Sequence, residues 1–156
     1  MFTTPKGYGL VFLDWNCHDE ERFKFLNTQW DVNAAKDILA KSQPTVGDLN
    51  LATVKEFLPP LPSAGEMLSA SYAPPATFPL LTIGLDFQKL IQMVTTWKPE
   101  TLAPVILTPY AGSYLPIDGW HRIATGIICG EKTLPAVSLT VKESRKCAGG
   151  NLKVIK

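Results

Sequence analysis

The sequence has 156 residues, of which 46% are apolar and 19% are charged, and its formal net charge is +1. These values are typical of one globular domain with a buried core, and they exclude an intrinsically disordered chain. The small net charge excludes a uniformly basic nucleic-acid-binding protein. The basic residues are nevertheless unevenly distributed, because residues 141–156 carry five basic side chains and one acidic side chain.

The cysteines indicate the compartment in which the protein works. Cys17, Cys129 and Cys147 are odd in number and form no CxxC pair, which is typical of a reducing environment. Their spacing relative to His18 and His121 does not fit a zinc site, so we expect no metal centre. No apolar stretch is long enough to span a membrane. We therefore expect a cytoplasmic protein without a membrane partner.

The first 60 residues predict one strand followed by helices. The apolar run from 9 to 15 predicts a strand. Three helical patterns follow: Phe23, Leu26 and Trp30 after the acidic residues 19–21; Val32, Ala35 and Leu39 after Asp31; and Leu51, Val54 and Leu58 after Asp48 or Asn50, ending at Pro59. Residues 1–60 are thus predicted to be a helical extension that packs on a core formed by 61–156. A protein partner is one candidate ligand of this extension.

The middle of the chain begins with a proline-rich segment, since residues 59–79 hold six of the 13 prolines. Within it, Ser63 and Glu66 fit a capping box and predict one or two helical turns. Residues 78–83 predict a strand. Asp86 is a suitable N-cap for the clearest helix, which ends before Pro99 and has one apolar face made of Phe87, Leu90, Ile91, Val94 and Trp97.

The most informative stretch lies at Asp118-Gly119. Two short apolar strands, 104–108 and 114–117, precede it, and a helical pattern over 121–129 follows and closes at Gly130. A strand that passes through a glycine turn into a helix directs unpaired N–H groups and the positive end of the helix dipole at one spot. This arrangement favours an anion. A closing strand is predicted over 133–141.

The run IDGWHRIATGIICGEKTLPAV, from Ile117 to Val137, resembles the core motif of the ParB/sulfiredoxin superfamily. Members carry a strand, a Gly-x-His-Arg or Gly-x-Arg-Arg turn that opens a helix, a glycine-containing loop and a further strand. The order of elements upstream also matches, so the resemblance covers about residues 78–141. It implies an α/β fold with a small mixed sheet flanked by helices.

The candidate site consists of six residues on and after the turn, and each also has a structural interpretation. Arg122 could contact phosphate or bridge to Asp118, and His121 could bind phosphate or pack locally. Asp118 could cap the helix, orient Arg122 or hold a phosphate-bound metal. Gly119 supplies the turn, Thr125 could offer a hydroxyl to the site or face solvent, and Trp120 could stack on a base or pack in the core.

The individual branches of the superfamily fit unequally. Trp120 stands where sulfiredoxins carry their reactive cysteine, so sulfinic acid reduction is excluded. The motif Gly-Glu-Arg-Arg of the chromosome-partitioning members is absent, and no helix-turn-helix domain follows. The resemblance is better to small kinases, ATPases and nucleases of the superfamily, which use an upstream carboxylate. That implies Glu66 or Asp86 as the catalytic group, although both already have a capping role.

Two functions follow as expectations. The first is nucleotide or phosphate binding at Asp118–Arg122, with ATP or CTP and Mg²⁺ as candidate ligands and with ATP hydrolysis, phosphoryl transfer or nuclease activity as the chemistry. The second is a non-enzymatic interaction module on the same fold, similar to small plasmid or phage regulators such as fertility-inhibition factors. The basic C-terminal tail is either a solvated end or a contact for nucleic-acid phosphates.

Overall fold

The computed structural model describes residues 1–8, 11–14, 22–58, 61–69, 81–84 and 86–156. In chain order the helices and strands are β1 (Val11–Asp14), β2 (Arg22–Phe25), β3 (Thr28–Asp31), α1 (Val32–Ser42), β4 (Gly47–Asn50), α2 (Leu51–Val54), η1 (Lys55–Phe57), α3 (Ala64–Met67), β5 (Leu81–Gly84), α4 (Phe87–Thr95), η2 (Pro99–Thr101), β6 (Val105–Tyr110), β7 (Ser113–Asp118), α5 (Trp120–Ile128), β8 (Thr133–Ser138), α6 (Val141–Cys147), β9 (Ala148–Gly150) and η3 (Leu152–Val154). The predicted mixed α/β class is confirmed.

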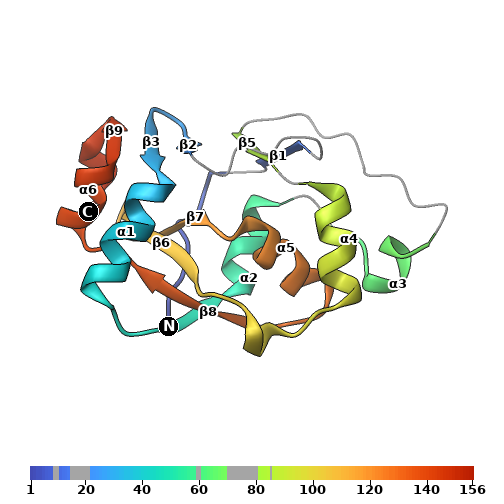
Figure 1. Ribbon diagram of the computed structural model, residues 1–156. Coiled ribbons are helices and arrows are strands. Elements are labelled where there is room, and N and C mark those ends of the chain that lie inside the picture. The colour runs from blue at the N-terminus through green and yellow to red at the C-terminus, as the bar shows by residue number, and fades with distance from the viewer. Residues whose placement is uncertain (9–10, 15–21, 59–60, 70–80, 85) are drawn as a thin grey trace.

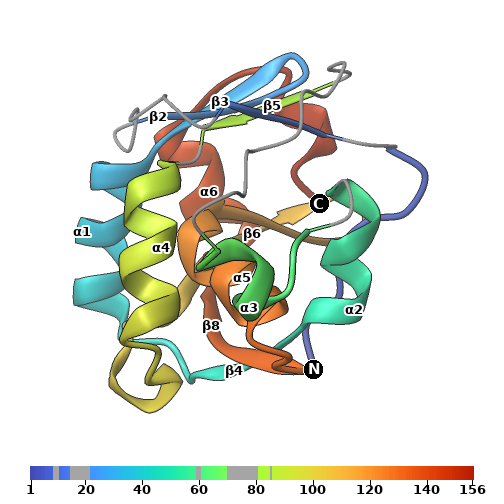
Figure 2. The same ribbon diagram turned by 90° about the vertical axis from the view of Figure 1, so that its right-hand side faces the viewer.

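The central sheet has the strand order β4-β8-β6-β7. β6 runs parallel to β8, whereas the other neighbours, β4 with β8 and β6 with β7, are antiparallel. In Figure 1, α5 lies beside α4 and α2 on one side of β6, and α1 and α6 lie together on the other side. Figure 2 shows α5 between α4 and α2. All six residues of β6 are buried, as expected for a strand covered on both faces.

Residues 2–4 connect the two edges of the central sheet. Phe2 donates its N–H to the carbonyl of Asp48 at 2.7 Å and accepts the N–H of Asn50 at 2.9 Å, both on the β4 edge. The carbonyl of Thr3 accepts the N–H of Tyr114 on β7 at 3.0 Å. These bonds satisfy backbone groups that edge strands otherwise leave exposed. The N-terminal segment therefore belongs to the sheet.

A second sheet, of order β2-β3-β9, forms where the sequence predicted a helix and a C-terminal tail. The helix expected through Phe23, Leu26 and Trp30 is wrong, because β2 and β3 form an antiparallel hairpin over these residues. Phe23, Phe25, Thr28 and Trp30 alternate with exposed residues, which is the period of a strand. Leu26 occupies the hairpin turn with a φ of +53°.

The C-terminal segment is also not a tail. Residues after 140 form α6, β9 and η3, and β9 pairs antiparallel with β3 through Gly149 and Gln29. Thr140 begins α6 with a complete capping box, in which its hydroxyl accepts the N–H of Glu143 while the Glu143 side chain accepts the N–H of Thr140. The last residues are folded against the rest of the chain.

The N-terminal 60 residues are not a purely helical extension. Asp31 is the N-cap of α1 and Asn50 the N-cap of α2, so the helices predicted after these two residues are confirmed. β4, however, lies between them and pairs with β8 in the central sheet, so this region supplies both strands and helices to the fold. The proposed domain boundary at residue 60 falls outside the described residues.

The other predicted elements agree with the structure where it describes them. Residues 11–14 of the first predicted strand form β1, and 81–83 of the later one lie in β5, which pairs parallel with β1; residues 9–10, 15 and 78–80 lie outside the described chain. Ser63 and Asp86 cap α3 and α4 as predicted. β6, β7, α5 and β8 match the four predicted elements around the glycine turn. Every helix of the described chain falls short of what a membrane crossing requires.

An aromatic cluster joins the two larger sheets. Phe25 of β2 lies 5.2 Å from Tyr110 of β6, and Phe23 lies 6.2 Å from Trp120 of α5, measured between ring centroids. Tyr8 contacts the Tyr110 ring at 5.8 Å. Burial, followed by the charge and hydrogen bond of Tyr8, raises the pKa of Tyr110 to about 12. The neutral phenol is thus part of the packed core.

Replacing Gly150 by Ala should destabilise the fold more than replacing Gly112 by Ala. Both glycines have positive φ, +88° and +80°, so both substitutions carry the left-handed penalty of about 1–2 kcal/mol. A Cβ on Gly150 would also lie 2.1 Å from the carbonyl oxygen of Asn27, whereas one on Gly112 meets nothing within 4 Å. We expect a total loss of about 3 kcal/mol or more for Gly150→Ala, measured by urea unfolding. Equal losses would contradict the docking of β9 on β3.

Tyr110 should make the protein sensitive to alkaline pH. Its pKa is about 12 in the folded chain, against about 10 in an unfolded chain, so the unfolded state loses the proton first as the pH rises. The stabilisation is complete below pH ~10 and is lost as the pH rises towards 12, by about 3 kcal/mol at most. Urea unfolding at several pH values should show a flatter alkaline limb for Tyr110→Phe. An unchanged pH dependence in this variant would refute the assignment.

Candidate functional site

The predicted turn has the expected backbone. Gly119 is the N-cap of α5 and has a φ of +98°, a left-handed conformation that few residues other than glycine adopt readily. A Cβ at this position would lie 2.9 Å from Nη2 of Arg122 and 3.1 Å from Val105. Glycine therefore provides both the turn and the space in which the Arg122 side chain lies. Ile123, in the first turns of α5, is fully buried.

The guanidinium of Arg122 is held by three oxygens of the protein. Nη2 donates to Oδ2 of Asp118 at 2.9 Å, and the two side chains are 17% and 18% exposed. Nη1 donates to the carbonyl of Ala103 at 2.6 Å and lies 3.3 Å from that of Pro104. Two of the alternatives raised for this pair are realised, since Asp118 orients Arg122 and Arg122 bridges to it. The arginine is fixed at the start of α5 while remaining partly accessible.

His121 brings the start of α4 to the same place. Its Nε2 accepts the backbone N–H of Asp86 at 2.7 Å, so the proton of the neutral ring is on Nδ1. The Asp86 carboxylate caps α4, with Oδ1 accepting from the N–H groups of Gln88 at 2.9 Å and Lys89 at 3.3 Å. The structure thus places Asp86 beside the predicted anion site, 35 residues from His121 along the chain.

Trp120 and Thr125 both point into the protein. The Trp120 side chain is 6% exposed, its Nε1 donates to the carbonyl of Pro116 at 3.0 Å, and its ring packs on Phe23. Thr125 is fully buried and its hydroxyl donates to the carbonyl of His121 at 2.7 Å. A buried ring cannot stack on a base, and a buried hydroxyl cannot reach a ligand. Both side chains support the turn from below.

Glu66 is not joined to this group. It lies on α3, is exposed, and its Oε1 accepts the hydroxyl of Ser63 at 3.2 Å. Within the described chain, no hydrogen bond or ion pair links Glu66 to the residues of the turn. The structure therefore brings together Asp86, Asp118, Gly119, His121 and Arg122 from the predicted set. The backbone carbonyls of Ala103 and Pro104 complete the arrangement, and no side-chain pattern in the sequence points to them.

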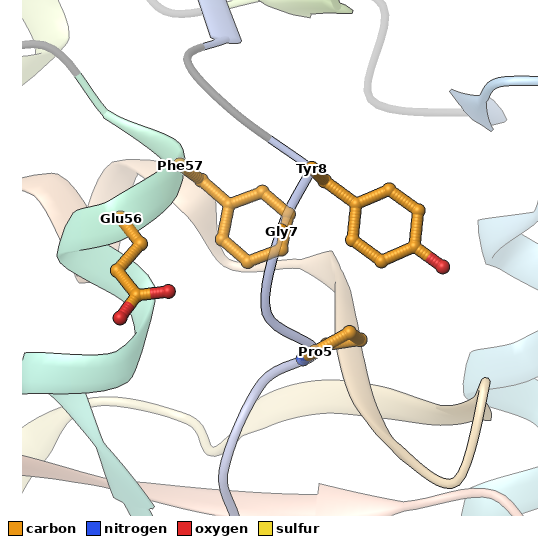
Figure 3. Close-up of a pocket in the computed structure, with 5 residues that line it drawn as sticks. All are labelled: Pro5, Gly7, Tyr8, Glu56 and Phe57. Carbon is orange, nitrogen blue, oxygen red and sulfur yellow. The ribbon is translucent and has the colours of Figure 1, made fainter.

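Two surface hollows lie elsewhere, along the N-terminal segment. One, of about 190 Å³, is lined by Pro5, Gly7, Tyr8, Glu56 and Phe57; Figure 3 shows the Tyr8 and Phe57 rings side by side with Pro5 below them. The other, of about 470 Å³, shares Pro5 and Tyr8 and includes Thr4. Among the residues that the structure describes, the Thr4 hydroxyl has no hydrogen-bond partner, but its oxygen is closed off from solvent. Neither hollow includes a predicted site residue.

The described cysteines have the properties of packing residues. Burial raises the pKa of Cys147, whose thiol donates towards the carbonyl of Ser144 at 3.4 Å. Burial and then the charge of Glu131 raise the pKa of Cys129. Thiols with raised pKa values are poor nucleophiles at neutral pH. Cys17 lies outside the described residues, and among those described no three His, Cys, Asp or Glu side chains are grouped as a metal would require.

Trp120→Phe should lower stability without changing ligand affinity. The phenyl ring retains most of the packing but loses the donor to Pro116, which costs about 1 kcal/mol, more if the carbonyl is left without a partner. Thermal unfolding measures the loss, and calorimetry with ATP measures binding. A fall in affinity in a folded Trp120→Phe protein would show that the indole contacts the ligand after all.

Comparisons with models of known protein families, with curated proteins and with solved structures find no match for this chain. The resemblance carried by residues 117–137 therefore stays a prediction. Any function assigned to the turn must come from the geometry of the residues that form it.

Proposed function

We propose that this protein binds a phosphate-bearing ligand, a nucleotide such as ATP or CTP with Mg²⁺, at the N-terminus of α5. The observation that carries this proposal is the absence of a side-chain cap at the N-terminus of α5. In the described chain, side chains cap α1, α2, α3, α4 and α6, whereas α5 begins without a side-chain cap. No side chain of the described residues supplies an acceptor at the start of α5, where the positive end of the helix dipole lies, and an anion can take that place.

The side chains around this end favour the same ligand. Arg122 is a cation in the first turn of α5, His121 next to it carries the proton of its neutral ring on Nδ1, and both are partly exposed. Arg122 still has donors beyond those used by Asp118 and Ala103, because a guanidinium carries five N–H groups. The Asp118 carboxylate already forms an ion pair with Arg122, and we expect a phosphate to compete with it for the guanidinium.

Asp86 is the better of the two predicted catalytic carboxylates. Its backbone is bonded to His121, which puts its carboxylate in the vicinity of a ligand at α5, whereas Glu66 makes no such contact in the described chain. If turnover of the nucleotide occurs, Asp86 is therefore the residue proposed to orient Mg²⁺ or water. Asp86→Asn is the variant that examines this role, because the amide can still cap α4.

Arg122→Ala should weaken ATP binding by about 1.5–3 kcal/mol, the range for a hydrogen bond to a charged group. Arg122→Lys should restore only part of it, since an ammonium cannot reproduce the planar fork. Asp118→Asn should strengthen binding, because it removes the anion that competes for the guanidinium. Isothermal calorimetry with ATP and CTP, with and without Mg²⁺, measures all three.

Thr125→Val provides the matched control. Its hydroxyl is buried and bonded to the carbonyl of His121, so its loss should lower stability by about 1 kcal/mol and leave affinity unchanged. No binding of either nucleotide by the wild-type protein at millimolar concentration would overturn the proposal. If Asp118→Asn lowers nucleotide affinity only when Mg²⁺ is present, Asp118 is assigned to metal binding instead of to competition for Arg122.

A second candidate, the non-enzymatic interaction module, is favoured by a different observation. Trp120 and Thr125 are buried, and two of the nitrogens of Arg122 are bonded within the protein, so these side chains already have structural duties. In this interpretation the turn is a scaffold and residues 1–60 contact a protein partner. Wild-type protein that binds no nucleotide, together with a biological effect that survives Arg122→Ala, would favour it.

A further inference from the structure

The folded C-terminus concentrates positive charge on one part of the surface. Residues 141–156 carry five basic and one acidic side chain, whereas residues 1–140 carry 10 basic and 13 acidic ones. The acidic exception, Glu143, is used to cap α6. The near-neutral total charge thus hides a separation between a positive C-terminal segment and a negative remainder.

Three of the cations form one exposed stripe of α6. Lys142, Arg145 and Lys146 are spaced i, i+3 and i+4, which puts them on the same helix face, while Ser144 and Cys147 are buried on the other. The carbonyl of Ile155 accepts a bond from Nη2 of Arg145 at 3.0 Å, so the segment with Lys153 and Lys156 lies against α6. We define the C-terminal basic face as these five residues: Lys142, Arg145, Lys146, Lys153 and Lys156.

The basic face is not neutralised by ion pairs within the described part of the chain. No carboxylate of the described residues forms an ion pair with any of the five cations. All five are exposed, and β9, the η3 turn and the bond to Arg145 fix the backbone that carries them. Because the backbone is already ordered, binding a polyanion costs only the rotamer freedom of the side chains themselves.

We propose that the C-terminal basic face binds the phosphate backbone of nucleic acid without sequence preference. The cations from Lys142 to Lys146 span about 6 Å along α6, and phosphates follow each other every 3.4 Å along the axis of a DNA strand, so the face can contact several of them. It carries no aromatic side chain for base stacking, which excludes a stacking platform. This proposal does not depend on the phosphate site at α5.

A membrane surface fits the same face less well. Basic patches hold a protein on lipid stably when an apolar anchor assists them. Among the described residues, the exposed large apolar side chains are Met1, Leu26, Val46 and Leu68, none of which belongs to the C-terminal segment. A polyanion that offers only regularly spaced phosphates is therefore the better partner.

The test measures fluorescence anisotropy of labelled 20-mers, single- and double-stranded, with the full chain in 50 mM salt. The variant Lys142→Gln/Lys146→Gln/Lys156→Gln should bind at least about tenfold more weakly, and the slope of log affinity against log salt for duplex DNA should fall by about 2–3, near 0.9 per lost contact. The matched control Lys55→Gln/Lys98→Gln/Lys132→Gln changes the net charge equally with exposed lysines elsewhere. It should bind as wild type.

A triple Lys→Arg variant at positions 142, 146 and 156 should keep the affinity, because it keeps the charge. The proposal is overturned if wild type does not bind the 20-mers at 100 μM protein, or if the control variant loses as much affinity as the test variant. Equal affinity for poly-glutamate of the same charge would assign the face to acidic proteins instead. Binding to anionic vesicles without binding to the 20-mers would assign it to lipid.

Discussion

The buried hydrogen bond between Trp30 and Ser144 is the interaction on which the arrangement of the sheets depends. The Trp30 indole donates to the Ser144 hydroxyl at 2.9 Å, and that hydroxyl is also bonded to the hydroxyl of Thr108. These residues come from β3, α6 and β6, so one small polar network joins the second sheet, the C-terminal helix and the central sheet. All three are almost completely buried, and each would leave an unpaired polar atom if the others moved. The network therefore fixes the relative positions of elements that hydrophobic contact alone would leave free to slide.

The candidate site depends on this polar network indirectly. The aromatic cluster that begins at Trp30 continues through Phe23 to Trp120, and Trp120 is the first residue of α5. The start of α5 is thus held from below by packing, and from the side by the bonds of Arg122 to Asp118 and Ala103. A site held in this way loses little free energy to reorganisation when a ligand binds, which suits an anion held by backbone N–H groups. The same rigidity is what a scaffold for protein contacts requires.

The local signals in the sequence predicted local structure well. Asp31, Ser63 and Asp86 each cap a helix as their side-chain chemistry predicts, and the glycine turn between β7 and α5 is where the change of periodicity puts it. The β2–β3 hairpin was not predictable in the same way, because Phe23, Leu26 and Trp30 fit a helical spacing and the turn uses leucine in a left-handed conformation instead of Asn-Gly. The partners of Arg122 at Ala103 and Pro104 are backbone carbonyls, which the identity of a side chain does not reveal. The docking of β9 depends on the absence of a side chain at Gly150, a contact that only the folded chain displays.

The position of residues 2–4 across the edges of the central sheet has a consequence for how the chain folds. Thr3 bonds to Tyr114, 111 residues later in the sequence, and Phe2 bonds to Asp48, 46 residues later, so the sheet joins segments that are far apart along the chain. Contacts this distant require large loops to close before they contribute any stability, which makes them late and slow steps. Until they form, β4 and β7 leave hydrogen-bonding groups open to strands of other molecules. An intermediate that lacks only residues 2–4 therefore still presents both edges of the central sheet to other molecules.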